Sequence, residues 1–96
     1  MNHYASPEFW EHYRGLPATT RKLADRSFAL LIANPRHPSL RLKQIRSYWS
    51  VRVGIHYRAV GISVPDGISW FWIGAHPEYE QLINHRLREE EHPDYA

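Results

Sequence analysis

The chain has 96 residues, of which 43% are hydrophobic and 14% aromatic, with a formal net charge of +2 and no cysteine. This composition excludes a disordered polymer, and the lack of cysteine excludes disulfides and thiolate–metal sites, so we expect a protein of the reducing cytoplasm. The sequence shows no basic-then-apolar leader and no apolar run of about 18 residues, so we expect neither secretion nor membrane insertion.

Positive charge is concentrated in the first part of the chain. Residues 1–60 contain ten basic and three acidic side chains, whereas residues 61–96 contain two basic and seven acidic ones. Ten of the twelve basic residues are arginine, whose planar guanidinium binds phosphate through paired hydrogen bonds. A basic half of this kind indicates either an anionic partner, with nucleic acid first in line, or a solvated arginine-rich surface.

Two helices with clear end signals are predicted first. The stretch SPEFWEHYRGLP has Ser6 as a cap, Pro7 at the first helical position and Gly15 as a stop. The stretch ATTRKLADRSFALLIANP, residues 18–35, repeats apolar residues at helical spacing and ends at its final proline. The short GLP connection between them predicts an antiparallel helical hairpin.

The apolar period then changes from helical spacing to alternation. Apolar and polar residues alternate over 40–43, 49–53 and 57–59, and VPDGIS is a turn signal. Residues 68–74 are typical of a strand that is apolar on both faces, and Pro77 opens a last amphipathic helix.

The order of these elements predicts an α+β fold. We expect one domain over residues 1–96, with the N-terminal helical hairpin packed on a three- to four-stranded antiparallel sheet and a short C-terminal helix. Residues 1–5 and 89–96 are expected to fray into solvent.

Two linked motifs carry a resemblance to a known family. The chain contains SVRVGIHYR at residues 50–58 and FWIGAH at residues 71–76, and with the helical hairpin it resembles the RelE/ParE superfamily of bacterial toxins over about residues 6–87. The resemblance implies a toxin that is neutralised by a cognate antitoxin. One branch of the family consists of endoribonucleases that cut mRNA, usually on the ribosome, without metal or cofactor. The ParE branch inhibits DNA gyrase without chemistry of its own, and an inactive or solitary relative is a third reading.

The sequence departs from the family pattern at two places. Family members usually begin with a strand, but only MNHYA precedes Ser6, so that strand is expected to be short or missing. A missing strand would leave a sheet edge through which a homodimer could form. Several nucleases of the family carry lysines or a glutamate in the middle of the sheet, where this chain has Ser50 and Arg52. The general base is therefore not assigned.

Metal-free RNA cleavage needs a base for the ribose 2′-OH, cations for the phosphate and an acid for the departing 5′-oxygen. Arg52 and Arg58 fall on one face if the strands meet in a tight turn at Gly54, and they would bind the phosphate, unless they are plain surface arginines. His76 follows a strand and precedes a helix, so it would donate the proton or merely cap the helix.

Further residues extend this candidate site. Tyr79 would position the nucleotide or pack in the core. Arg41 and Lys43 would widen the phosphate track. His56 shares a strand face with Arg58 and would pair with His76 in acid–base transfer, with Glu78 as an alternative base. The other histidines show no ligand spacing, so we expect no metal site.

Overall fold

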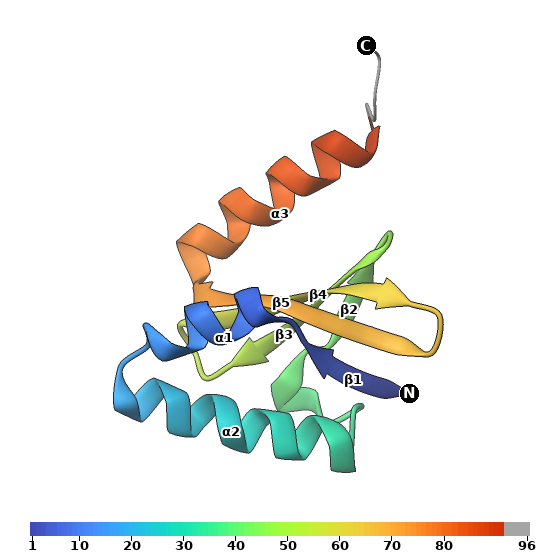
Figure 1. Ribbon diagram of the computed structural model, residues 1–96. Helices are drawn as coiled ribbons and strands as arrows, with labels where there is room; N and C mark the ends of the chain where they lie inside the picture. The colour runs from blue at the N-terminus through green and yellow to red at the C-terminus, as the bar shows by residue number, and fades with distance from the viewer. Residues whose placement is uncertain (92–96) are drawn as a thin grey trace.

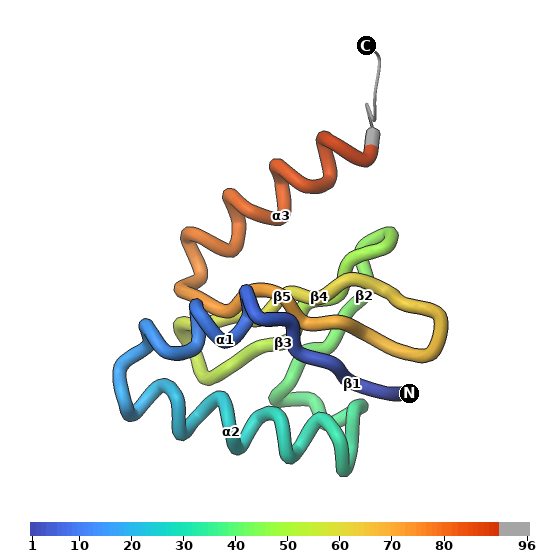
Figure 2. The backbone as a smooth tube through the Cα atoms, in the orientation of Figure 1, coloured from blue at the N-terminus to red at the C-terminus, as the bar shows by residue number. Residues whose placement is uncertain are grey.

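The computed structural model describes residues 1–91, and it consists of one sheet with helices on both sides (Figures 1 and 2). In chain order its elements are β1 (Asn2–Ala5), α1 (Pro7–Arg14), α2 (Ala18–Ala33), the 3₁₀ helix η1 (Pro38–Leu40), β2 (Lys43–Ile45), β3 (Tyr48–Val53), β4 (Tyr57–Val64), β5 (Gly67–Ala75) and α3 (His76–Glu91). The α+β class and both predicted N-terminal helices are confirmed.

The sheet differs from the expected antiparallel one. It has five strands in the order β1-β5-β4-β3-β2, and β1 runs parallel to β5 while the other neighbours are antiparallel. The predicted antiparallel sheet of up to four strands is present as β2–β5, and the prediction missed the fifth strand, β1, and its parallel direction.

The first strand accounts for this difference. Residues 2–5, which were expected to fray, pair with residues 67–70. The backbones come very close at Gly67, where an added Cβ would lie 1.9 Å from the Asn2 carbonyl oxygen. The Asp66 carboxylate accepts hydrogen bonds from the Asn2 amide and the Tyr4 hydroxyl. The strand is present, so the argument for a homodimer through a missing-strand edge falls away.

The first helix begins and ends where its sequence signals indicate. The Ser6 hydroxyl oxygen accepts a hydrogen bond from the Phe9 backbone N–H at 3.2 Å, and Gly15 follows the last turn. The Ser6 N–H donates to the Trp70 carbonyl oxygen at 2.9 Å, which turns the chain from β1 into α1 at the edge of the sheet.

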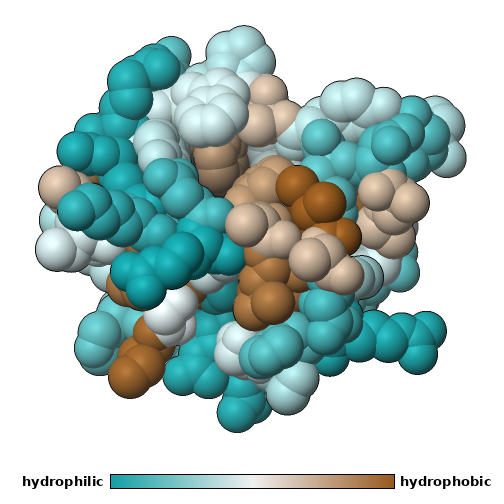
Figure 3. Space-filling view, turned by 90° about the horizontal axis from the view of Figure 1, so that it is seen from below, coloured by the Kyte–Doolittle hydropathy of each residue, from teal (hydrophilic) through white to brown (hydrophobic). Residues whose placement is uncertain are grey.

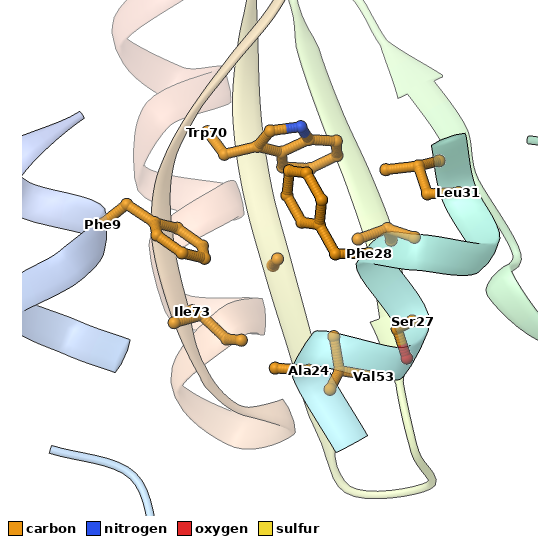
Figure 4. A pocket seen from close by; sticks show the side chains of 10 residues that line it. Phe9, Ala24, Ser27, Phe28, Leu31, Val53, Trp70 and Ile73 are labelled. Atoms are coloured by element: carbon orange, nitrogen blue, oxygen red, sulfur yellow. The ribbon is translucent and has the colours of Figure 1, made fainter. Parts of the chain in front are cut away.

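One core lies between the sheet and the first two helices (Figure 4). Its fully buried indole, Trp70, lies over Phe28 of α2, and Phe9 of α1 approaches from the other side. The space left among these side chains is about 20 Å³, room for roughly one water molecule, so this cavity is a packing defect and not a ligand site. The buried members of this core are Phe9, Leu16, Ala24, Leu31, Leu40, Val51, Val53, Ala59, Ile68, Trp70 and Ile73.

Some apolar side chains of the hairpin face outward instead. Ile32 of α2 is 65% exposed, and Trp10 of α1 is 44% exposed. The view from the α2 side shows an apolar area bordered by hydrophilic side chains (Figure 3).

The last helix crosses the opposite face of the sheet. Its Tyr79 and Ile83 pack with Tyr48, Val60 and Trp72 of the sheet in a second core. The helix is longer than the short one predicted, because its far end is fixed: Arg46 donates to the Leu87 carbonyl oxygen at 3.1 Å, and the Ser47 hydroxyl donates to Glu90 at 2.6 Å.

The C-terminal fraying expected over residues 89–96 is wrong for residues 89–91, which are helical, and its remainder lies outside the described residues. None of the helices in the described part of the chain has the length and apolar character needed to cross a membrane.

Candidate functional site

Two arginines face each other at one end of the sheet. Arg52 of β3 and Arg58 of β4 are direct cross-strand partners, joined by a turn in which Gly54 has a φ of +61°. By alternation they share the face of Ser50 and Val60, and Val60 packs under α3. The expectation that a tight turn at Gly54 brings these two residues to one face is met.

The charge of this pair is not balanced within the described chain. Like charges opposite each other destabilise a strand pair, and across residues 1–91 neither guanidinium has a carboxylate partner. Arg52 Nε donates to the Gly54 carbonyl oxygen at 3.0 Å, and one terminal nitrogen of Arg58 donates to the Tyr57 carbonyl oxygen at 3.0 Å. The remaining N–H groups are therefore available to an anion.

Electrostatics links Arg58 to three other candidate residues. Burial is the main cause that lowers the pKa of the Arg58 guanidinium, and the positive charges of Arg52 and Arg41 lower it further, while Tyr79 acts in the opposite direction. Of these residues, Arg52 is the direct cross-strand partner of Arg58. A bound phosphate would relieve the repulsion among the three cations.

Arg41 and Lys43 lie beside this cluster. Arg41 follows η1 with a φ of +45°, a left-handed conformation that is uncommon for a residue with a side chain. Lys43 of β2 is exposed and is the strand partner of Ser50, two positions before Arg52. In residues 1–91 neither side chain forms an ion pair.

Tyr79 belongs to the first turn of α3. Its residue is 5% exposed, it packs in the second core, and its ring stacks on that of His76 with centroids 5.8 Å apart. This burial agrees with the interpretation of Tyr79 as a core residue, and the interpretation that it positions the nucleotide stays a prediction.

His76 is the first residue of α3, and its ring is already engaged. Its Nε2 lies 2.9 Å from the Glu80 carboxylate, and its backbone N–H donates to the His56 carbonyl oxygen at 2.8 Å. A carboxylate only accepts, so the ring proton of the neutral imidazole is assigned to Nε2. Nδ1 is buried and has no partner among residues 1–91. The ring contacts the side chains of Glu80 and Tyr79.

The two candidates for the general base, His56 and Glu78, lie outside the arginine pair. His56 is exposed in the β3–β4 turn. Glu78 lines a groove between the α1–α2 connection and the end of β5, together with Glu11 and His12.

The contact between Glu80 and His76 was not predicted from the sequence. The available signal was the spacing of four residues, which places the two side chains on the same face of a helix. Over the described part of the chain no three His, Cys, Asp or Glu side chains cluster in a way that could hold a metal ion.

Comparison with known proteins gives a likeness in structure alone. No family model matches the sequence, and no curated protein does. A chain of the RelB–RelE antitoxin–toxin complex of Methanococcus jannaschii superposes with a TM-score of 0.63 at 18% identity, over 82% of this chain and 96% of that one. YafQ of E. coli BL21(DE3) gives 0.62 at 14% identity, over 81% and 96%. YoeB from a Staphylococcus aureus dimer gives 0.59 at 17% identity, over 79% and 97%. The chain therefore has the fold of the RelE/ParE-superfamily toxins.

Proposed function

We propose that this chain, which has the RelE/ParE toxin fold, is the toxin of a toxin–antitoxin pair and a metal-independent endoribonuclease that cleaves mRNA, with the ribosome as the place of cleavage. The observation that supports the proposal most is the Arg52–Arg58 pair, whose two guanidiniums lie opposite each other without a carboxylate partner in residues 1–91. Chains with the same fold occur in structures described as toxins and as toxin–antitoxin complexes.

The proposed reaction is an in-line transfer at one phosphodiester. The ribose 2′-oxygen attacks the adjacent phosphorus, the new 2′-O–P bond forms, and the P–O bond to the 5′-oxygen breaks. The products are a 2′,3′-cyclic phosphate and a free 5′-hydroxyl. Arg52 and Arg58 bind the non-bridging oxygens and stabilise the charge that builds on them, while Tyr79 positions the nucleotide.

Proton transfer is assigned to His76. The doubly protonated ring donates from Nε2 to the leaving 5′-oxygen, since Nδ1 is buried and cannot reach RNA. The leaving oxygen then takes the place of Glu80, which lies at Nε2 in the free chain. The base for the 2′-OH remains one of two candidates, His56 or Glu78, and Arg41 and Lys43 extend the phosphate track.

Substitutions at the site test this proposal. Arg58→Ala is expected to reduce mRNA cleavage about 10²- to 10³-fold, the usual cost of losing one preorganised charge stabiliser, and to abolish growth arrest. Arg26→Ala, an exposed arginine of α2, is the matched control. His76→Ala is compared with His85→Ala, which removes a similar histidine–glutamate pair of the same helix (2.8 Å). The assignment fails if Arg58→Ala and His76→Ala both cleave mRNA like the wild type.

A gyrase inhibitor of ParE type is the second candidate, and the state of His76 is the observation that favours it. With Nε2 at Glu80 and Nδ1 buried, the ring is not free for proton transfer in the described chain. The arginines would then bind a protein or DNA surface, or the chain would be inactive. Accumulation of gyrase-linked DNA breaks in cells whose mRNA stays intact would establish this alternative and refute the nuclease.

The proposed partner is a cognate antitoxin. Its positively charged target would be the arginine face of the sheet beside α3, over which the antitoxin would lay a helix or strand. Co-expression with the product of the neighbouring gene, followed by purification of the pair, tests for it.

A further inference from the structure

A second groove has Arg52 among the residues that line it. It measures about 330 Å³ and lies between α2, η1 and the β3–β4 turn. Arg52 forms part of its wall, fixed there by the hydrogen bond from Nε to the Gly54 carbonyl oxygen. Arg52 is also the cross-strand partner of Arg58, so this one residue belongs both to the groove lining and to the arginine pair.

The lining of the groove combines apolar and hydroxyl groups. Leu40 is 1% exposed and forms an apolar floor, while Ile55 on the turn is 71% exposed. Ser27 and Ser39 contribute hydroxyls. The Ser39 hydroxyl bonds His37 Nδ1 at 2.8 Å, whereas that of Ser27 has no partner among residues 1–91. Ser27 also lines the small core cavity of Figure 4, where its side chain points away from Phe9.

This lining suits a planar ring with polar edges. Nucleobases are held by contact of their faces with apolar or aromatic side chains and by hydrogen bonds to their edges. Serine hydroxyls donate or accept, so they accommodate any base edge. The volume lies near the lower end of the range for ligand pockets, roughly 300–1,000 Å³, which fits one nucleoside.

We propose that this groove is a nucleobase subsite, which receives the base of the RNA nucleotide next to the phosphate held by Arg52 and Arg58. The inference rests on the proposed function, because it takes the arginine pair as the phosphate site. The base contacts Leu40 and Ile55 with its face, and its edge hydrogen-bonds the Ser27 and Ser39 hydroxyls. Selection in this subsite follows the size of the base more than its pattern of donors and acceptors.

Two ligands separate the base from the phosphate. Amide chemical shifts are followed during titration with adenosine 5′-monophosphate and, separately, with ribose 5-phosphate. Both ligands are expected to shift Arg52 and Arg58, and only the nucleotide is expected to shift Ser27 and Ile55 as well. Equal shifts with both ligands would overturn the base subsite and leave the phosphate site standing. No shift at either arginine with either ligand would contradict the phosphate site itself, and with it the subsite.

A pair of exposed isoleucines supplies the matched variants. Ile55→Ser is expected to weaken nucleotide binding about threefold to tenfold, because the base loses its apolar contact, and to leave ribose 5-phosphate binding unchanged. Ile32→Ser, at 65% exposure on α2, is the control and should bind both ligands like the wild type. Ser27→Leu, which fills the groove, should act in the same direction as Ile55→Ser. Equal nucleotide affinity of Ile55→Ser and Ile32→Ser would refute the subsite.

Discussion

Replacing Gly67 by alanine tests the pairing of the first strand with the rest of the sheet. Gly67 is the strand partner of Asn2, and an added Cβ would lie 1.9 Å from the Asn2 carbonyl oxygen and 2.8 Å from its nitrogen. These are backbone atoms, so no side-chain rotation relieves the overlap. Either the start of β1 moves away from β5, or the two strands pair in a different register.

The cost follows from the bonds that hold this end of β1. The Asn2 N–H donates to the Asp66 carbonyl oxygen at 3.0 Å, and the Asn2 and Tyr4 side chains both donate to the Asp66 carboxylate. With a net value of about 1 kcal/mol for each hydrogen bond, partly reduced by solvent exposure, we expect a loss of about 2–3 kcal/mol. For a domain of this size that corresponds to a fall in Tm of roughly 10–20 °C.

Thermal unfolding followed by circular dichroism measures this loss, with Gly15→Ala as the control. At Gly15 the nearest atom to an added Cβ is the His12 carbonyl oxygen at 3.5 Å, and the backbone is right-handed helical. That substitution should change stability by less than about 1 kcal/mol in either direction. If Gly67→Ala melts within about 2 °C of Gly15→Ala, the close approach of β1 and β5 is refuted.

Two further substitutions test the pH dependence of the first strand and the role of the buried tyrosine. Trp70 Nε1–H donates to His3 Nδ1 at 3.0 Å, and burial, followed by the charge of the N-terminal amine, lowers the pKa of His3. The stabilising effect of neutral His3 is therefore complete above about pH 6.5 and is lost as the pH falls through the lowered folded-state pKa. His3→Asn keeps an acceptor that does not titrate, so its urea midpoint should fall less than that of the wild type between about pH 7.5 and about pH 5; an equal fall in both proteins would exclude His3 as the cause. Tyr79→Phe keeps the buried ring and removes the hydroxyl near Arg58, so stability should change by less than about 1.5 kcal/mol while kcat/KM for RNA drops about tenfold or more. Unchanged kcat/KM would make Tyr79 a core residue only.

Local signals in the sequence were sufficient for the helices and for the arginine hairpin. The Ser6 cap and the Gly15 stop fix α1 within a few residues. Alternation and the glycine turn at Gly54 bring Arg52 and Arg58 to one face, because a strand has a period of two.

Long-range contacts explain what the sequence did not reveal. The segment NHYA has only four residues, which is too short to show a strand pattern. The strand β1 forms because its backbone pairs with β5 beside Gly67 and its side chains hydrogen-bond Asp66, more than sixty residues away. The end of α3 is held by Arg46 and Ser47 of the β2–β3 turn. The direction of the His76 ring depends on its rotamer and on Glu80, and neither motif nor spacing specifies a rotamer.

The most direct test of the proposed nuclease is cleavage of a defined mRNA by purified protein in the presence of EDTA, with analysis of the ends produced. We expect the wild type and Arg26→Ala to yield 2′,3′-cyclic phosphate and 5′-hydroxyl ends, and Arg58→Ala to lose this cleavage about 10²-fold or more. Intact mRNA with the wild-type protein, both free and on ribosomes, or equal cleavage by Arg58→Ala, would contradict the account.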